Sequence, residues 1–164
     1  MIGRAAPVAL ACHEQPPSLR KLTPRFFKLY FRLMTVPVMR DCADFPWHLS
    51  VEVDYTELAD NEMPTLDESE LLNKTCDQIE PAVLEPRTKL DAVNALILAR
   101  STWGGIRELA FQVHDQETVH QSLQELLKSR EWERHWQYEM RSDPSWKSAG
   151  HFFRLFPLAR GDDA

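Results

Sequence analysis

The feature that most constrains the fold is a pair of glycines, Gly104-Gly105, between two apolar runs in the segment 92–115. Both central residues of a primed β-turn need positive φ, which glycine adopts without steric cost, so the pair predicts a two-residue hairpin. Four pairs of residues should then lie opposite one another: Trp103 and Ile106, Thr102 and Arg107, Arg100 and Leu109, and Leu98 and Phe111.

Side chains alternate across a sheet, so one face of this hairpin should belong to the core. We expect that face to contain Leu96, Leu98, Leu109, Phe111 and Val113, extended toward the turn by Arg100, Thr102 and Arg107. The opposite face should contain Ile97, Ala99, Ala110, Ile106 and Trp103, with Ser101, Glu108 and Gln112 among them. That second face is mixed in polarity, so we expect another part of the chain or a partner to cover it.

The segments before the hairpin are predicted to be a strand and a helix. Residues 46–55 alternate cleanly, with Trp47, Leu49, Val51, Val53 and Tyr55 on the apolar side. Thr65 and Glu68 fit a capping box, in which each side chain satisfies a free backbone N–H of the other's turn. The helix that follows should bury Leu71, Leu72, Cys76 and Ile79 and end near Pro81. Cys76 is interpreted as a small core residue.

After the hairpin, Asp115 should cap a second helix whose apolar stripe is Val119, Leu123, Leu126 and Leu127. Residues 132–140 alternate again, which predicts a fourth strand. Asp143-Pro144 has the capping carboxylate and first-turn proline that favour a last helix. The inner side of that helix should be Trp146, Ala149, Phe153 and Phe156.

The order strand, helix, strand, strand, helix, strand predicts an α+β fold of the ferredoxin-like βαββαβ type. We expect a four-stranded antiparallel sheet with two helices on one face, a C-terminal helix and an extra N-terminal segment. In this plan the strand of residues 92–102 lies at an edge. A long edge strand that is apolar on both faces is typically covered, paired in a homodimer or offered to a partner.

Charge divides the chain into a basic N-terminal extension, residues 1–44, and a single acidic domain, residues 45–164. The net charge is −6; residues 1–45 carry seven Lys/Arg against three Asp/Glu, or +4, which leaves −10 for the rest. Residues 20–34 form a basic amphipathic pattern with three open interpretations. The segment docks on its own sheet, contacts an anionic membrane surface, or lies upstream of a natural start at Met39.

Composition excludes several classes of function. An acidic domain does not suit a phosphate backbone, so no nucleic acid is expected as a partner, whereas a cationic protein partner is favoured. Cys12, Cys42 and Cys76 are odd in number and scattered, which predicts a reducing compartment, the cytoplasm. There is no phosphate-binding glycine loop, Gly-x-Ser-x-Gly or His-Glu-x-x-His motif in the sequence. We therefore expect no catalytic residues, no metal and no cofactor.

Several short motifs resemble the bacterial family known as domain of unknown function 695. They are Pro46-Trp47, Leu72-Asn73, Ile79-Glu80, Ala99-Arg100-x-Thr102, Gly105-x-Arg107-Glu108, Val113-x-Asp115 and Asp143-Pro144-x-Trp146. The resemblance covers about residues 45–157, and it departs from the family at Phe111-Gln112, where a pair of aromatic residues is common. It implies no activity, but its plan is similar to that of the RraB-type inhibitors of ribonuclease E, small acidic proteins that bind an enzyme.

Two groups of residues are candidates for function. Arg100, Thr102 and Arg107, with Trp146 as a neighbour, could hold a carboxylate or a phosphate. The alternative is that the two arginines pair with Asp115 or Asp143 and pin the last helix to the sheet, which is how buried arginines usually occur. The second group, Trp103, Ile106, Glu108 and Asp54, is predicted to bind a partner, with Trp103 as its anchor. The alternative for Trp103 is a packing residue that covers the end of the hairpin.

The leading hypothesis is therefore a non-enzymatic, protein-binding regulatory module whose partner is a basic protein, for example a nuclease that it inhibits. The alternative hypothesis is a small-ligand or enzymatic site around Arg100 and Arg107.

Overall fold

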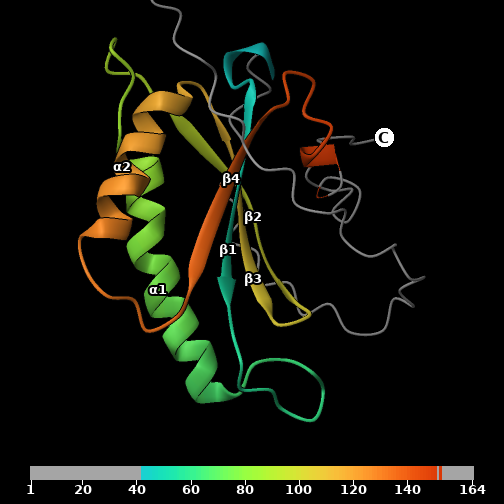
Figure 1. Cartoon of the computed structure of the whole chain (residues 1–164). Coiled ribbons are helices and arrows are strands. Elements are labelled where there is room, and N and C mark those ends of the chain that lie inside the picture. Colours follow the sequence, from blue (N-terminus) through green and yellow to red (C-terminus); the bar gives the residue numbers. More distant parts are fainter. Residues whose placement is uncertain (1–41, 151, 153–164) are drawn as a thin grey trace, which may run out of the picture.

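The computed structural model describes residues 42–150 and 152, which fold into one sheet with two helices (Figure 1). Its elements follow the chain in the order η1 (Cys42–Asp44), β1 (Trp47–Asp54), α1 (Leu66–Leu84), β2 (Ala95–Trp103), β3 (Ile106–Val113), α2 (Gln116–Lys128) and β4 (Trp136–Ser142). The predicted basic segment 20–34, Phe153 and Phe156 lie outside the described residues.

The strands form a four-stranded sheet in the order β2-β3-β1-β4, and every neighbouring pair is antiparallel. Both helices lie on the same side of this sheet (Figure 1). The expectation of an α+β fold with an antiparallel sheet and two helices is thus confirmed, and β2 lies at an edge as predicted.

The hairpin turn has the geometry that its glycines require. Gly104 and Gly105 have φ of +57° and +87°, the left-handed region in which a side chain would be strained. Three of the predicted pairs are confirmed: Trp103 with Ile106, Thr102 with Arg107 and Arg100 with Leu109.

The fourth pair is wrong, because the ladder contains a β-bulge between Ile97 and Ala99. Phe111 pairs with Ile97, and Leu98 is the extra residue. A bulge reverses the alternation of the strand, so Ala95 and Ile97 face the helices, whereas Leu96 and Leu98 lie on the second face. The predicted faces of Leu96, Ile97 and Leu98 are therefore wrong. The sequence could not indicate this, since β2 is apolar on both sides and any register would bury leucines.

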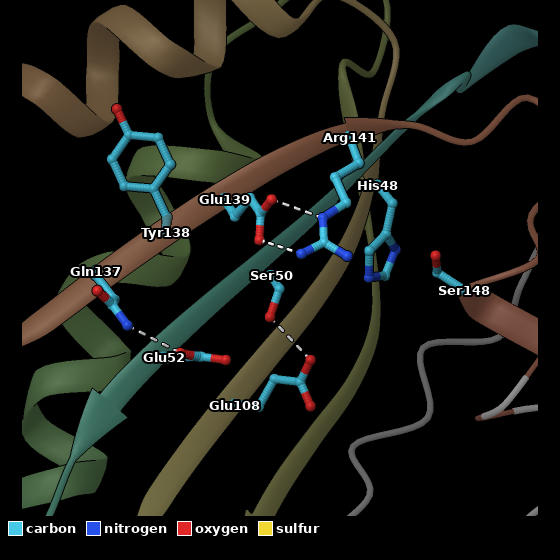
Figure 2. A pocket seen from close by; sticks show the side chains of 9 residues that line it. All are labelled: His48, Ser50, Glu52, Glu108, Gln137, Tyr138, Glu139, Arg141 and Ser148. Carbon is cyan, nitrogen blue, oxygen red and sulfur yellow. Dashed lines mark hydrogen bonds and ion pairs between the residues drawn. The ribbon is translucent and has the colours of Figure 1, made fainter. Parts of the chain in front are cut away.

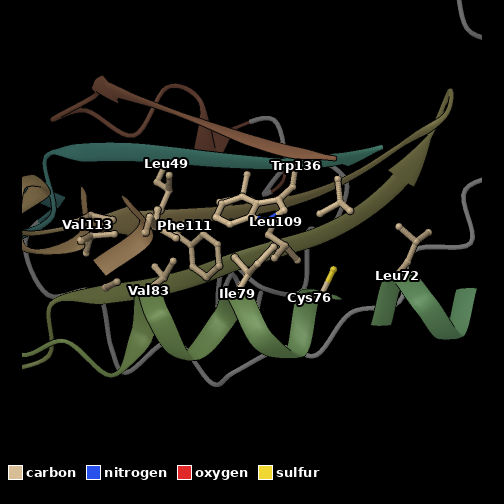
Figure 3. Packing of buried hydrophobic residues seen from close by; sticks show 14 of the residues in the cluster. Leu49, Leu72, Cys76, Ile79, Val83, Leu109, Phe111, Val113 and Trp136 are labelled. Atoms are coloured by element: carbon tan, nitrogen blue, oxygen red, sulfur yellow. The ribbon is translucent and has the colours of Figure 1, made fainter. Parts of the chain in front are cut away.

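The main core lies between the sheet and the helices (Figure 3). Leu49, Val51 and Val53 of β1 are fully buried against a stripe of α1 that consists of Leu72, Cys76, Ile79 and Val83. The predicted stripe of α2 also packs here, with Val119 and Leu123 fully buried. The helix α1 does not end at Pro81; it continues to Leu84, which lets Val83 reach the core.

Only half of the predicted capping box forms. The Thr65 hydroxyl accepts a hydrogen bond from the Glu68 N–H at 3.3 Å. The Thr65 N–H donates instead to the carbonyl of Glu57 at 3.0 Å, and the Glu68 carboxylate binds the guanidinium of Arg134. This contact also explains why β4 begins at Trp136 rather than at residue 132: Arg134 belongs to a loop that turns back toward α1.

The second face of the sheet is covered at one end by two chain segments that meet there. Phe45, Trp146 and Ala149 pack on Leu96 and Leu98. The Trp146 indole N–H lies 3.0 Å from the carbonyl oxygens of both Cys42 and Phe45, to which it donates. Of the two covers expected for this face, another part of the chain or a partner, the first is therefore present at this end.

The predicted last helix does not begin at Pro144. Trp146 has φ +53°, which a right-handed helix cannot contain, and helical backbone starts only at Ala149. The Asp143 carboxylate still acts as a cap, accepting hydrogen bonds from the N–H groups of Lys147 and Ser148 at 2.8 Å each. Within the described residues, no helix has the length and apolar character needed to cross a membrane.

Candidate functional site

Arg100, Thr102 and Arg107 meet on the helix-covered face of the sheet, as the hairpin register predicted. The Arg100 guanidinium forms an ion pair with Glu80 of α1, a contact that also includes a hydrogen bond from Nε at 3.2 Å, and a second ion pair with Asp77 at 3.3 Å. The partners of Arg100 are therefore acids of α1. The sequence interpretation had named Asp115 and Asp143 instead, and that pairing is wrong for Arg100.

Arg107 is only 7% exposed and binds neutral groups. Its Nε donates to the Thr102 hydroxyl at 3.0 Å, and its Nη1 donates to the Asn73 side-chain oxygen at 2.6 Å. Burial lowers the pKa of Arg107 below the ordinary arginine value. These contacts tie β3 to β2 and α1, so the two guanidiniums are engaged by the protein's own side chains.

Cys76 of α1 lies near both guanidiniums, and burial raises its pKa to about 11. The thiol is therefore protonated and unreactive near neutral pH. The interpretation of Cys76 as a core residue agrees with its complete burial. Trp146, the fourth residue of the predicted group, is not brought together with the arginines, because it packs on the opposite face of the sheet.

The residues predicted to bind a partner do lie together, on the second face at its turn end. Asp54 of β1 pairs with Ile106 of β3, which in turn pairs with Trp103 of β2. Trp103 is 54% exposed, and Glu108 follows Ile106 on the same face. Asp54 also contacts His135 at 3.0 Å.

Beside this group the second face forms a concave polar pocket of about 550 Å³ (Figure 2). Its lining residues come from β1, β3, β4 and the turn after β4: His48, Ser50, Glu52, Glu108, Gln137, Tyr138, Glu139, Arg141 and Ser148. The lining includes three carboxylates and one arginine, and that arginine donates a hydrogen bond to Glu139 at 2.7 Å. The pocket is therefore acidic.

Glu52 and Glu108 face each other directly on adjacent strands. The Ser50 hydroxyl donates to the Glu108 carboxylate at 2.8 Å, and Ser101 donates to its other oxygen at 3.3 Å. Gln137 donates to Glu52 at 3.1 Å. Like charges directly opposite each other on adjacent strands repel, so this pair favours the approach of a cation.

His48 lies at the covered end of the pocket and is only 8% exposed. Its Nδ1 has no hydrogen-bond partner among the described residues, and neither side-chain polar atom of the neighbouring Gln112 has one. Burial lowers the pKa of His48 from its ordinary value of 6.5, against the opposing effect of the Glu108 and Asp143 carboxylates. The imidazole is therefore neutral at pH 7, with a ring nitrogen available as an acceptor.

Sequence reasoning missed this pocket, although part of its signal was present. The alternation of residues 46–55 places His48, Ser50 and Glu52 on one polar side of a strand. Their proximity to Glu108 and Arg141 depends on how β1 pairs with β3 and β4, which are distant in the sequence. No local pattern specifies that register.

Comparison with known proteins gives one result. The model of a family of unknown function (DUF695) matches residues 33–153, a range that begins upstream of the expected residue 45 and ends before residue 157. No curated protein and no solved structure matched the chain. The matched range includes every described strand and helix, and the chain therefore belongs to this family of unknown function, DUF695.

Proposed function

We propose that this protein is a non-enzymatic regulatory module that binds a basic protein through the second face of its sheet. A cytoplasmic nuclease that it inhibits is the partner class we favour. The strand order β2-β3-β1-β4 supports the ferredoxin-like plan and, with it, the proposed likeness in fold to the RraB-type inhibitors. Fold alone does not determine function, so the proposal depends on the face itself.

The observation that carries the proposal is an exposed indole bordered by carboxylates. Trp103 stands at the hairpin end of the face. Glu108 lies on the adjacent strand β3, and Glu52 and Asp54 lie on β1, one strand further from β2. Tryptophan is enriched among the residues that dominate binding energy at protein interfaces. Surrounding negative charge attracts a basic partner and rejects an acidic one.

The alternative site around Arg100 and Arg107 is less well supported. A ligand carboxylate or phosphate would need free N–H donors, and it would have to displace Glu80 and Asp77 from Arg100, or Asn73 from Arg107. We interpret this cluster as one that holds α1 against the hairpin.

Affinity capture from a lysate of the native host tests the proposal. The full chain should retain a basic protein at low salt and release it as salt rises, since the attraction between exposed charges is screened. For the captured protein, Trp103→Ala should weaken binding by about 30-fold, the effect of losing an interface anchor worth about 2 kcal/mol.

The matched control is Leu90→Ala, which removes another exposed apolar side chain, 92% exposed and in the loop between α1 and β2. This variant should bind as well as the native chain. Equal losses in both variants, or retention that does not change with salt, would contradict the proposal.

A further inference from the structure

We infer that the acidic pocket of β1, β3 and β4 binds the guanidinium group of an arginine side chain presented by the partner. This inference rests on the proposed function, because it names the group of the basic partner that the second face recognises. It assigns a ligand to His48, Glu52 and Glu108; the sequence placed only Glu108 in a candidate site, the partner-binding group of Trp103.

The first argument is the arrangement of charge. The register places Glu52 directly opposite Glu108, and both line the same pocket (Figure 2). The cation of the pocket, Arg141, forms its ion pair with Glu139, and it interacts with Glu52 only through space. A cation between Glu52 and Glu108 would turn a repulsive cross-strand pair into two attractive contacts.

The second argument is independent of the carboxylates. His48 is more than nine-tenths buried and lines the same pocket, yet its Nδ1 has no hydrogen-bond partner among the described residues. A buried polar atom is normally paired, so the unpartnered ring nitrogen of a residue that lines the pocket indicates that a further group completes this site. Because the imidazole is neutral, it does not repel a cation.

These groups select the class of cation. A guanidinium is planar and carries five N–H donors, so it can bind a carboxylate through two parallel hydrogen bonds and still donate to a further acceptor. An ammonium group has three donors and no fork. A metal ion is a poorer match, since the described residues contain no cluster of three or more His, Cys, Asp or Glu side chains placed to hold one.

Titration of the full, isotope-labelled chain with N-acetyl-arginine methylamide, followed by NMR, tests the inference. The expected result is a saturable shift of the backbone amides of His48, Ser50 and Glu108, with none at Trp103 on the edge strand. The neutral isostere N-acetyl-citrulline methylamide should not shift these amides, and the lysine analogue should bind more weakly.

Variants then assign the site. The double substitution Glu52→Gln and Glu108→Gln should weaken arginine binding by at least about tenfold, as expected for lost hydrogen bonds to charged groups. Glu131→Gln makes the same chemical change at an exposed residue outside the pocket and should have no effect. If the double variant does not fold, the comparison of arginine with citrulline on the native chain still decides.

Equal binding of the arginine and citrulline probes, or shifts scattered over the surface, would overturn the inference. Its failure can be distinguished from failure of the proposed function. If a captured protein binds the native chain and the double variant equally well, the proposed function stands and the inference about the pocket fails. If the arginine probe binds the pocket but no protein is captured, the inference about the pocket stands and the proposed function fails.

Discussion

The two faces of the sheet hold their charged residues in different ways. On the helix-covered face, Arg134 binds the buried Glu68 carboxylate through two hydrogen bonds of 2.7 and 2.6 Å, and Arg100 is paired with Glu80. On the second face, Glu52 lies opposite Glu108. Charges under the helices are thus matched by opposite charges. In the pocket, Arg141 is paired with Glu139, but Glu52 and Glu108 bring two like charges together.

The difference teaches how to separate residues that serve the fold from those available for binding. Removing one member of a buried ion pair destabilises a protein, because the remaining charge stays buried without compensation. Removing one member of a like-charge pair should relieve repulsion instead. Stability measurements on charge-neutralising variants can therefore test whether the two faces differ as described.

The largest effect is expected for Arg134→Met. This change leaves the Glu68 carboxylate, whose side chain is 1% exposed, without its guanidinium. The free energy of unfolding should fall by about 3 kcal/mol, measured by urea denaturation at pH 7. Lys74→Met, which breaks the exposed pair between Lys74 and Glu133, is the control and should leave the midpoint unchanged. If both variants lost a similar amount of unfolding free energy, the buried Arg134–Glu68 pair would be no more important for stability than the exposed Lys74–Glu133 pair.

A second effect is expected in acid. The Arg134 guanidinium holds the pKa of Glu68 below its ordinary value of 4.5, and the Thr118 hydroxyl holds that of Asp115 below 3.8. A carboxyl group whose pKa is lower in the folded state stabilises the fold above its unfolded pKa, and this contribution is lost as the pH falls through the folded value. Stability should therefore decline below pH 4.5, and less steeply in Arg134→Met. Identical slopes in the two chains would show that Glu68 is not responsible.

On the second face the pH dependence should begin nearer neutrality. Burial lowers the pKa of His48 from 6.5, so below that pH the unfolded chain binds a proton that the folded chain resists. Stability should fall as the pH is lowered from 7 to 5, and His48→Gln should flatten this part of the curve. His120→Gln, at an exposed residue of α2, is the matched control. A slope that survives His48→Gln would assign it to other groups.

The smallest effect has the opposite sign. Glu52→Gln removes the repulsion with Glu108 and should raise the free energy of unfolding by about 0.3 kcal/mol in the absence of a ligand. Careful urea denaturation in low salt, with Glu131→Gln as the reference, can detect such a gain. A clear loss of stability would mean that the Glu52 carboxylate is already compensated within the protein.

Features that depend on neighbouring residues in the sequence could be predicted. The turn at Gly104-Gly105, the alternation of residues 46–55 and the Asp115 cap all arise within a few residues, and each is present. The proximity of Trp103, Ile106 and Asp54 followed from the same local rules combined with the strand order.

Features that depend on contacts between distant segments could not be predicted. Asp77 and Glu80 became the partners of Arg100 through the packing of α1 on the sheet, a relation that no spacing in the sequence shows. The start of the last helix was wrong because Trp146 adopts a left-handed backbone to place its indole N–H between two carbonyls of the chain near Cys42. Tertiary contacts outweighed a good local capping signal there.

The bulge at Leu98 determines how the edge of β2, which no described strand pairs with on its outer side, can be used. An extra residue interrupts the regular row of outward N–H and C=O groups and twists the strand, which makes it a poor template for edge-to-edge aggregation. Regular pairing beyond the bulge remains available along Arg100–Trp103, which ends at the exposed indole. A second copy or an extended peptide that joins this edge would thus be directed to the hairpin tip, next to the acidic pocket.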